Sequence, residues 1–461
     1  MSRHTNSMHA KIHRMTGAKC IIGLLLLRGV AAWTVDIVHD ITVHMNHVTS
    51  VPFNIPDYNL SSNLSLVVTS QDNDIAIPSF ELLQNENKSC NGILNVTGVF
   101  LGRTKLIFTL EEDGVKDSQE VSRIIVVREE RTIDTIFTAS VAILVSILYI
   151  NFGCAMDWDV CRDTLKKPIG PAIGFFCQFL IMPVLSFFIG YLLFPDRPEL
   201  QIGMFFTGIS PSGGASNIWT VLLDGNLNLS ITMTTICTIA AFGMMPFWIF
   251  TLGRHIFAQG QLAVPYSQIG TFVIGLVIPL LIGFVIQRKL PRVSKMLVRI
   301  MKPFSIVLII FIVIFAITTN LYLFKLFSWE IIIAGMGLPW LGFTFGLIVA
   351  KICKQSQADI RAIAIETGIQ NTGVAIFLLR FTLKPPSDDL TTVLPVSTAI
   401  MTPIPLTVLY IIKLIYRYTH KAEAKIVLET VPSLEKLQQT TNVSTITQLN
   451  ESKEITQLND N

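Results

Sequence analysis

From residue 132 to residue 418, long apolar runs alternate with short polar loops. A helix needs about 20 apolar residues to cross the hydrocarbon core of a bilayer, and nine of these runs are long enough. The pattern therefore predicts an all-α polytopic membrane domain with nine transmembrane helices. The expected spans are residues 133–153, 169–194, 201–223, 227–252, 267–287, 303–324, 330–350, 359–381 and 391–414.

The third and eighth spans each contain a polar interruption near the middle. The third reads Gly208-Ile-Ser-Pro-Ser-Gly-Gly-Ala-Ser-Asn217, and the eighth reads Glu366-Thr-Gly-Ile-Gln-Asn-Thr-Gly373. Proline removes a backbone donor and glycine weakens a helix, so we expect both helices to unwind there. Two discontinuous helices in matching places are typical of inverted-repeat transporters, in which they cross at the binding site. The match requires that the first half of the domain lacks its first helix.

Glu366 is the carboxylate that the pattern places deep in the membrane. A charged side chain at the bilayer centre costs about 2.5–3.5 kcal/mol, which favours a functional role over one hydrogen bond to a neighbouring helix. With Gln370, Asn371 and unwound backbone carbonyls it forms a ligand set suited to a hard cation. Ser230 and Thr234, four residues apart, share one face of the fourth span and would add hydroxyls, unless each only bonds its own helix.

Residues 33–131 have a different pattern from the rest of the chain. Short β-branched runs alternate with Gly, Pro, Asn and Asp, which predicts a small antiparallel β-rich domain. Its role is open between a structural or trafficking module, which we favour, and ligand binding. The runs are residues 34–38, 64–69, 99–110 and 124–127.

Residues 1–32 have the pattern of a secretory signal peptide: a basic start, a short apolar core and the small residues Val30-Ala-Ala. An uncleaved anchor is the alternative. Four glycosylation sequons follow within forty residues, which favours an exported, glycosylated domain. The acceptor residues are Asn59, Asn63, Asn87 and Asn95.

The composition agrees with a membrane protein. Hydrophobic residues make up 51% of the chain and charged residues 15%, against about 25% charged in ordinary soluble domains. The net charge of +3 is too small to imply nucleic acid, and no cysteine or histidine spacing suggests a transition metal. Basic residues concentrate in the loops that are inside if residue 33 is outside, which predicts a cell-membrane protein with an extracellular N-terminus. Residues 419–461 would form a disordered cytoplasmic tail.

Two stretches of the chain, residues 211–235 and 366–371, resemble the bile acid:sodium symporter family, as do residues 153–183 and 243–246. The resemblance covers about 132–418 and is greatest for the bile-acid-carrying ileal members. The glycosylated N-terminal domain instead resembles that of the orphan members, sodium/bile acid cotransporters 3 and 5. The resemblance implies a symporter of a small amphipathic organic anion, with Na⁺ as the coupling ion and no other cofactor.

The resemblance also implies two sodium sites that share one carboxylate. Asn371, next to Gln370, is a candidate for a substrate contact. The family's Pro-Gly-Gly-Thr-Ala-Ser-Asn is here Pro-Ser-Gly-Gly-Ala-Ser-Asn, so Ser212 replaces a glycine and Gly214 replaces a threonine. We expect this departure to affect substrate contacts more than the ions. The first site would use Ser216, Asn217, Ser230, Thr234 and Glu366, and the second Gln178, Glu366, Gln370 and the backbone carbonyls of Thr367 and Ile369.

Two other classes of function compete with transport. A transport-silent receptor or scaffold would act through residues 33–131, and the intact set of ion ligands argues against it. A hydrolase is disfavoured because the spans contain no Ser–His pair, no paired carboxylates and no His-rich metal motif. The sequence therefore predicts a transporter rather than an enzyme.

Overall fold

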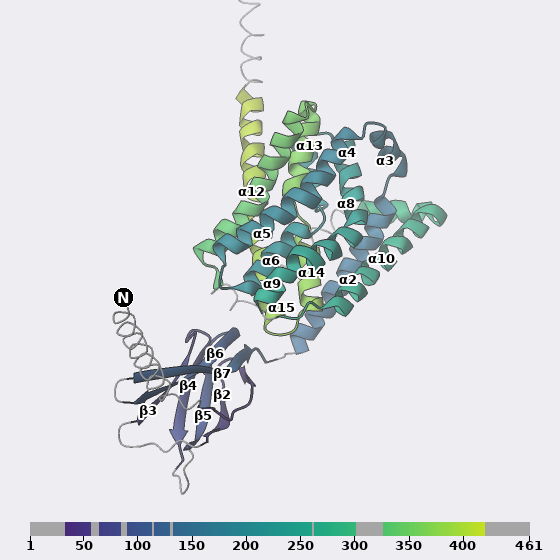
Figure 1. Ribbon diagram of the computed structural model, residues 1–461. Helices are drawn as coiled ribbons and strands as arrows, with labels where there is room; N and C mark the ends of the chain where they lie inside the picture. The colour runs from purple at the N-terminus through teal and green to yellow at the C-terminus, as the bar shows by residue number, and fades with distance from the viewer. Residues whose placement is uncertain are drawn as a thin grey trace, which may run out of the picture. The chain divides into compact units, whose positions relative to one another are not determined.

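The computed structural model describes residues 33–56, 64–83, 90–112, 115–129, 132–260, 262–300 and 326–419. These residues form two compact units (Figure 1). One unit holds the described residues up to Ser140 together with Leu383–Leu390, and the other holds Val141–Thr382 and the residues from Thr391 onward. The expected signal peptide, the sixth span and residues 420–461 of the expected tail lie outside the described residues.

The N-terminal unit contains two β-sheets. The four-stranded sheet has the order β1-β7-β6-β3, and the three-stranded sheet has the order β2-β5-β4. β1 pairs with β7 in parallel, and the other neighbours are antiparallel. The strands are β1 (Asp40–His44), β2 (Val48–Ile55), β3 (Leu64–Ser70), β4 (Ala76–Leu82), β5 (Cys90–Gly98), β6 (Gly102–Glu112) and β7 (Val115–Val127).

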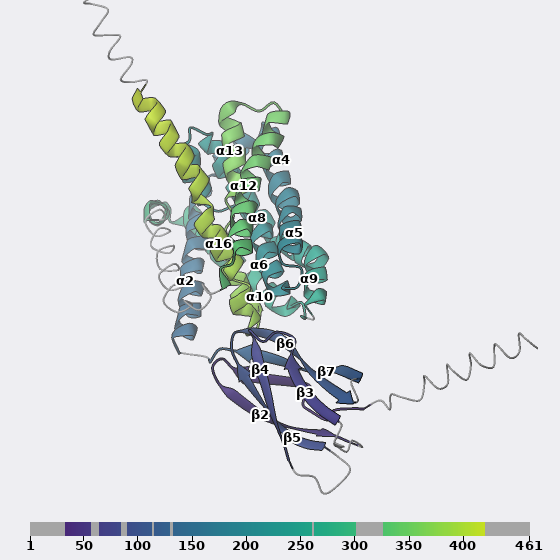
Figure 2. The same cartoon turned by 90° about the vertical axis from the view of Figure 1, so that its left-hand side faces the viewer.

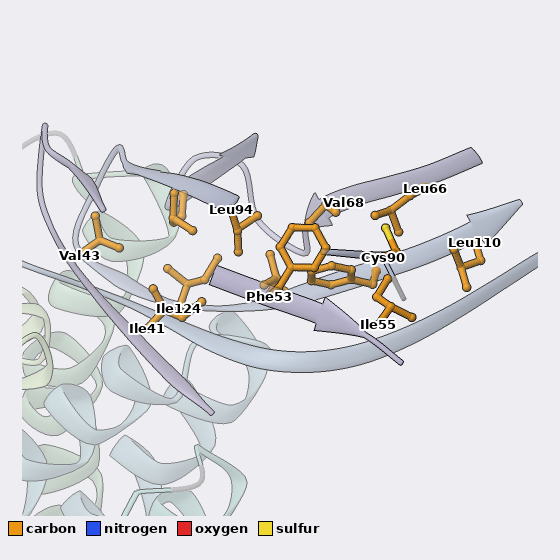
Figure 3. Packing of buried hydrophobic residues seen from close by; sticks show 14 of the residues in the cluster. Ile41, Val43, Phe53, Ile55, Leu66, Val68, Cys90, Leu94, Leu110 and Ile124 are labelled. Carbon is orange, nitrogen blue, oxygen red and sulfur yellow. The ribbon is translucent and has the colours of Figure 1, made fainter. Parts of the chain in front are cut away.

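The core of this unit lies between the two sheets, as in a β-sandwich. Burial alternates along β5, so its Leu94 points inward with Phe53 of β2, toward Val68 and Ile124 of the other sheet (Figure 3). The rings of Phe53 and Phe108 meet edge to face with centroids 5.3 Å apart and join the sheets.

The sequence predicted the β-rich character of this unit but not its arrangement. The run 34–38 is not a strand, and only Asp36 pairs, in an isolated bridge with Asn54. The prediction missed the three-stranded sheet because polar, proline and glycine residues break the apolar alternation, as at Pro52 and Gly92. The prediction of a single antiparallel sheet was also wrong. There are two sheets, and β1 and β7 pair in parallel, which short-range sequence patterns do not reveal.

Of the four predicted glycosylation sites, Asn95 lies among the described residues and the other three do not. Asn95 is half-buried on β5, and its Oδ1 accepts a hydrogen bond of 2.6 Å from Ser50 Oγ. The flanking residues Leu94 and Val96 point into the core, so Asn95 points away from it.

The remaining elements are helical. The helices are α2 (Thr132–Ala155), α3 (Trp158–Leu165), α4 (Ile169–Phe176), α5 (Met182–Leu193), α6 (Pro198–Ile209), α7 (Ala215–Leu222), α8 (Leu227–Trp248), α9 (Arg254–Gln259), α10 (Tyr266–Lys289), α12 (Trp329–Ile352), α13 (Gln357–Gly368), α14 (Thr372–Thr382), α15 (Ser387–Leu390) and α16 (Val393–Met401), with π-helical turns η1 (Cys177–Ile181) and η2 (Ile249–Gly253).

Within the described ranges, five helices are long and apolar enough to cross a membrane, and six if the bent pair Ala142–Ala155 and Trp158–Leu165 is one span. Figure 2 shows the last of them, in yellow, as a long rod beside α12. The chain is therefore a multi-pass membrane protein. The five are Ile169–Leu193, Leu227–Gln259, Tyr266–Lys289, Trp329–Ile352 and Ser387–Thr419.

The third and eighth expected spans are interrupted helices, as the sequence predicted. α6 ends at Ile209 and α7 begins at Ala215, while α13 ends at Gly368 and α14 begins at Thr372. Each half is 8 to 12 residues long, shorter than the roughly 20 residues that span a bilayer.

Small residues let α12 lie close against α13. A Cβ atom on Gly346 would lie 2.9 Å from Ala364 Cα, and one on Gly342 would lie 3.0 Å from Gly368 Cα. Close helix packing through small residues is the usual way that membrane helices associate. This contact supports the helix that carries Glu366.

Candidate functional site

The two unwound segments lie side by side and pair with each other. Gly213 N donates to Ile369 O at 2.8 Å, and Asn371 N donates to Pro211 O at 2.8 Å. Gly213 suits this approach, because a Cβ atom there would lie 3.0 Å from Gln370 O. The third and eighth spans therefore cross at their breaks, with the backbone groups freed by unwinding satisfied across the crossing.

Glu366 lies in the last turn of α13 and is 1% exposed. Its Oε2 accepts from Ser230 Oγ at 2.8 Å, and its Oε1 accepts from Thr234 Oγ1 at 2.5 Å. Among the described residues, no Lys, Arg or His pairs with it, and no Lys or Arg is buried. A buried carboxylate without a countercharge is costly, so this site favours a bound cation or a proton.

The start of α7 supplies further oxygens. Ser216 is fully buried, and its Oγ and the Oδ1 of Asn217 lack a hydrogen-bond partner among the described residues. One turn after Ser216, Thr220 Oγ1 donates to Ser230 Oγ at 3.3 Å, so this face of α7 is turned toward the ligands on α8. Buried oxygens with free lone pairs are what a hard cation needs.

A second group of polar side chains contacts both unwound segments. Gln178 Nε2 donates to Ser210 O at 2.7 Å and to Gln370 Oε1 at 2.8 Å. Gln370 Nε2 in turn donates to Thr367 O at 2.9 Å. These residues are buried, and the amides tie the second span to both unwound segments.

Gln178 reaches the crossing from the π-helical turn η1. Pro183 follows this turn and has no backbone N–H, so it cannot donate to Phe179 O. Trp248 Nε1 donates to that oxygen instead, at 2.8 Å. Single π turns often occur at functional sites, and here the turn sets the direction of Gln178.

Of the residues that the sequence assigned to the first sodium site, Ser230 and Thr234 contact the Glu366 carboxylate, and of those assigned to the second, Gln178 and Thr367 contact Gln370. Asn371, the expected substrate contact, is half-buried, and its Oδ1 accepts from Val374 N at 3.2 Å at the start of α14. Sequence reasoning missed Thr220, which the spacing from Ser216 would have identified as sharing the same helix face. It also missed that the Ser212 hydroxyl bonds the backbone of the other unwound segment, because Ser212 was expected to affect substrate contacts.

An apolar crevice lies between helices of the same unit. Aromatic rings form part of its wall, with Tyr149 and Phe242 centroids 6.3 Å apart. The lining residues come from α2, α8, η2, α10 and α14 and are Tyr149, Ala241, Phe242, Met245, Pro246, Ile249, Ile269, Phe272, Val273, Leu276 and Leu378.

The far end of α7 is held by the last span. Lys413 Nζ donates to Leu222 O at 2.6 Å and pairs with Asp224 Oδ2 at 2.6 Å, and Arg417 pairs with the same carboxylate at 2.9 Å. The hydrogen bond from Lys413 is the main cause that lowers the pKa of Asp224 below its ordinary value. The basic groups also complement the negative end of the α7 dipole.

Two interrupted helices that cross beside a buried carboxylate in a multi-pass protein define a secondary transporter. The chain belongs to the sodium bile acid symporter family, whose pattern matches residues 142–326. This confirms the resemblance on which the sequence interpretation depended. The family consists of sodium-coupled transporters rather than enzymes.

Three relatives illustrate the match. The ileal sodium/bile acid cotransporter of Oryctolagus cuniculus is 30% identical over 261 residues, 56% of this chain and 74% of that protein. The P3 protein of Homo sapiens is 30% identical over 245 residues, 52% of this chain and 51% of that protein. The sodium-dependent organic anion transporter of Bos taurus is 31% identical over 253 residues, 54% of this chain and 65% of that protein.

Proposed function

We propose that this protein is a sodium-coupled symporter of an amphipathic organic anion that works by alternating access. The observation that carries the proposal is Glu366, a buried carboxylate whose hydrogen-bond donors among the described residues are hydroxyls and which lies at a crossing of two broken helices. A cation that binds there neutralises the charge and links the two breaks. Membership of the sodium bile acid symporter family supports sodium as that cation.

The proposed ions share Glu366. The orphaned oxygens of Ser216 and Asn217 support the first site, because a cation would supply the partners that the chain does not. The first site uses Ser216, Asn217, Ser230, Thr234 and Glu366, and the second uses Gln178, Glu366, Gln370 and the carbonyls of Thr367 and Ile369.

Charge balance favours a monoanionic substrate. Two sodium ions against one carboxylate leave one positive charge in the site, which one anionic group would neutralise. A membrane potential that is negative inside then contributes about 2.3 kcal/mol per 100 mV to the driving force for each net positive charge carried inward. The names of the relatives, a sodium/bile acid cotransporter and an organic anion transporter, support this class of substrate.

The lining of the apolar crevice has the chemistry that contacts the apolar part of an amphipathic substrate. Its walls are aliphatic, aromatic and methionine side chains, which would contact a rigid hydrocarbon body without strong directional demands. Asn371, beside the crossing, is the proposed polar contact for the anionic group.

The proposal includes nine spans in the cell membrane, with the N-terminus extracellular and the C-terminus cytoplasmic. Residues 303–324 supply the sixth span, and spans 1–4 and 5–9 form incomplete inverted repeats. Residues 1–32 are the signal peptide, 33–131 a glycosylated extracellular domain, 132–418 the symporter domain and 419–461 a disordered tail.

Uptake by cells that express the full chain tests this function. Tauro-conjugated bile acids and sulfated steroids would be offered as labelled substrates in sodium medium and in choline medium. We expect uptake of at least one anion in sodium medium that disappears in choline. A correctly delivered protein without sodium-dependent uptake of any anion in the panel would contradict the proposal and favour a transport-silent receptor or scaffold.

A further inference from the structure

Ser212 lies in the first unwound segment and is 1% exposed. Its Oγ donates to Glu366 O at 3.1 Å and, more weakly, to Ile369 O at 3.4 Å. The hydroxyl therefore belongs to one broken span and hydrogen-bonds the backbone of the other. It is not among the oxygens assigned to either sodium site.

The carbonyls that this hydroxyl contacts are at the end of α13, which ends at Gly368. The last carbonyls of a helix have no partner within the helix, and they form the negative end of its dipole. A positively polarised hydroxyl proton and a sodium ion are attracted to them for the same reason. Ile369 O also accepts from Gly213 N at 2.8 Å, and it shares the single hydroxyl proton of Ser212 with Glu366 O.

The two sodium sites differ in this respect. In the first, Ser216 Oγ and Asn217 Oδ1 have no hydrogen-bond partner among the described residues, so a cation would meet free lone pairs. In the second, Thr367 O accepts from Gln370 Nε2 at 2.9 Å, and Ile369 O is occupied as described above. In the opposite orientation of the Gln370 side-chain amide, Oε1 would face Thr367 O, and two acceptor oxygens would meet. The hydrogen-bond network therefore fixes the orientation in which Nε2 donates to Thr367 O.

Sodium that coordinates Ile369 O must therefore compete with the donors on this oxygen. Gly213 N–H is part of the backbone pairing at the crossing and cannot leave without opening it. The hydroxyl of Ser212 can leave by rotation about a single side-chain bond. Of the two donors on Ile369 O, the hydroxyl is the one that a cation can displace at low cost.

We propose that Ser212 is a positioning residue whose hydroxyl competes with sodium for the carbonyl oxygen of Ile369, just after the end of α13. This inference rests on the proposed function, because it assumes that sodium binds at the second site. It follows that the first site fills before the second, and that the second binds sodium more weakly than it would with glycine at position 212, the residue of the family pattern.

Sodium titration of thermal unfolding tests this with the purified full-length chain. Ser212→Ala and Ser212→Gly remove the competing hydroxyl, so we expect the sodium concentration at half-maximal stabilisation to fall about three-fold, consistent with one long, neutral hydrogen bond. Ser212→Thr keeps a hydroxyl and should retain the wild-type midpoint. Unfolding temperatures in choline alone would show whether each variant is folded.

Thr207→Val is the matched control. Thr207 is fully buried in α6, and its Oγ1 donates to Gly203 O within the same helix at 2.8 Å. The change also deletes one buried hydroxyl bond but should leave the sodium midpoint unchanged.

The outcomes separate the two proposals. A sodium midpoint in Ser212→Ala that is unchanged or higher, while the wild type responds to sodium, would overturn the role of Ser212 and leave the symporter intact. A wild-type protein that sodium does not stabilise, and that shows no sodium-dependent uptake, would overturn the proposed function and this inference with it.

Discussion

Thr234→Ala is the most informative single change in the proposed first sodium site. Thr234 Oγ1 donates to Glu366 Oε1 at 2.5 Å and has a longer contact, 3.0 Å, to Ser230 O of its own helix, while its lone pairs remain able to contact a cation. Alanine removes these contacts in a position that is 6% exposed, so water does not readily replace them. The change should weaken sodium binding, the opposite direction from Ser212→Ala.

The size of the effect follows from the kind of bond that is lost. A hydrogen bond to a charged group contributes about 1.5–3 kcal/mol. At about 1.4 kcal/mol for each factor of ten, this corresponds to roughly 10- to 150-fold in an equilibrium constant. Ser230 still donates to the other carboxylate oxygen, so we expect the sodium concentration for half-maximal uptake to rise about ten-fold.

Thr235→Ala is the control for this prediction. Thr235 is the next residue on α8 and is 7% exposed, but its Oγ1 donates to Ile231 O of its own helix at 2.9 Å. Uptake would be measured against sodium concentration, with each variant normalised to its amount at the cell surface. Equal sodium dependence of Thr234→Ala and Thr235→Ala would refute the assignment of Thr234 to the ion site.

Three further changes test the surroundings of the site. Gly213→Ala places a Cβ atom 3.0 Å from a backbone oxygen of the other segment and should abolish most sodium-dependent uptake by separating the crossing, whereas Gly243→Ala, with open space around it, should not. Trp248→Phe removes the donor to Phe179 O, so the π turn should shift and half-maximal uptake should need several-fold more sodium. Asp224→Asn should lower the unfolding temperature of the purified protein at neutral pH by weakening its pairs with the last span.

The Asp224 prediction has a definite pH dependence. The pKa of this carboxyl is lower in the folded protein than its ordinary value of about 3.9. Its contribution to stability is therefore fully present above that value and is lost as the pH falls through the folded pKa. The difference between wild type and Asp224→Asn should be constant from about pH 6 to pH 8 and disappear in acid. A difference that changes between pH 6 and pH 8 would contradict the role of Asp224 in holding the last span. Equal uptake by Gly213→Ala and Gly243→Ala would contradict the close crossing at Gly213. An unchanged sodium requirement in Trp248→Phe would contradict the role of Trp248 in supporting the π turn.

The interruptions were predictable because their cause is local. Pro211 and the neighbouring glycines disrupt regular helix wherever they occur, and the polar Glu366 segment stands out against apolar flanks. The spacing of Ser230 and Thr234 also placed both hydroxyls on one face, and the structure brings both to the carboxylate.

What the sequence did not reveal depends on partners far apart in the chain. The bond from Ser212 to the end of α13 joins residues 154 positions apart, and its effect is visible only when the crossing is formed. The β-sandwich was missed for the same reason, since β1 and β7 pair in parallel across most of the domain. Local pattern identifies which segments are unusual, whereas tertiary pairing decides what those segments contact.

The central claim is that Glu366 holds the coupling sodium ions. The most direct measurement is uptake of a labelled organic anion in sodium and in choline medium by cells that express Glu366→Gln or wild type at equal surface levels. The amide keeps the shape of the side chain and removes the charge, so we predict normal delivery to the surface and no sodium-dependent uptake. Sodium-driven uptake by Glu366→Gln that approaches the wild-type level would contradict the account.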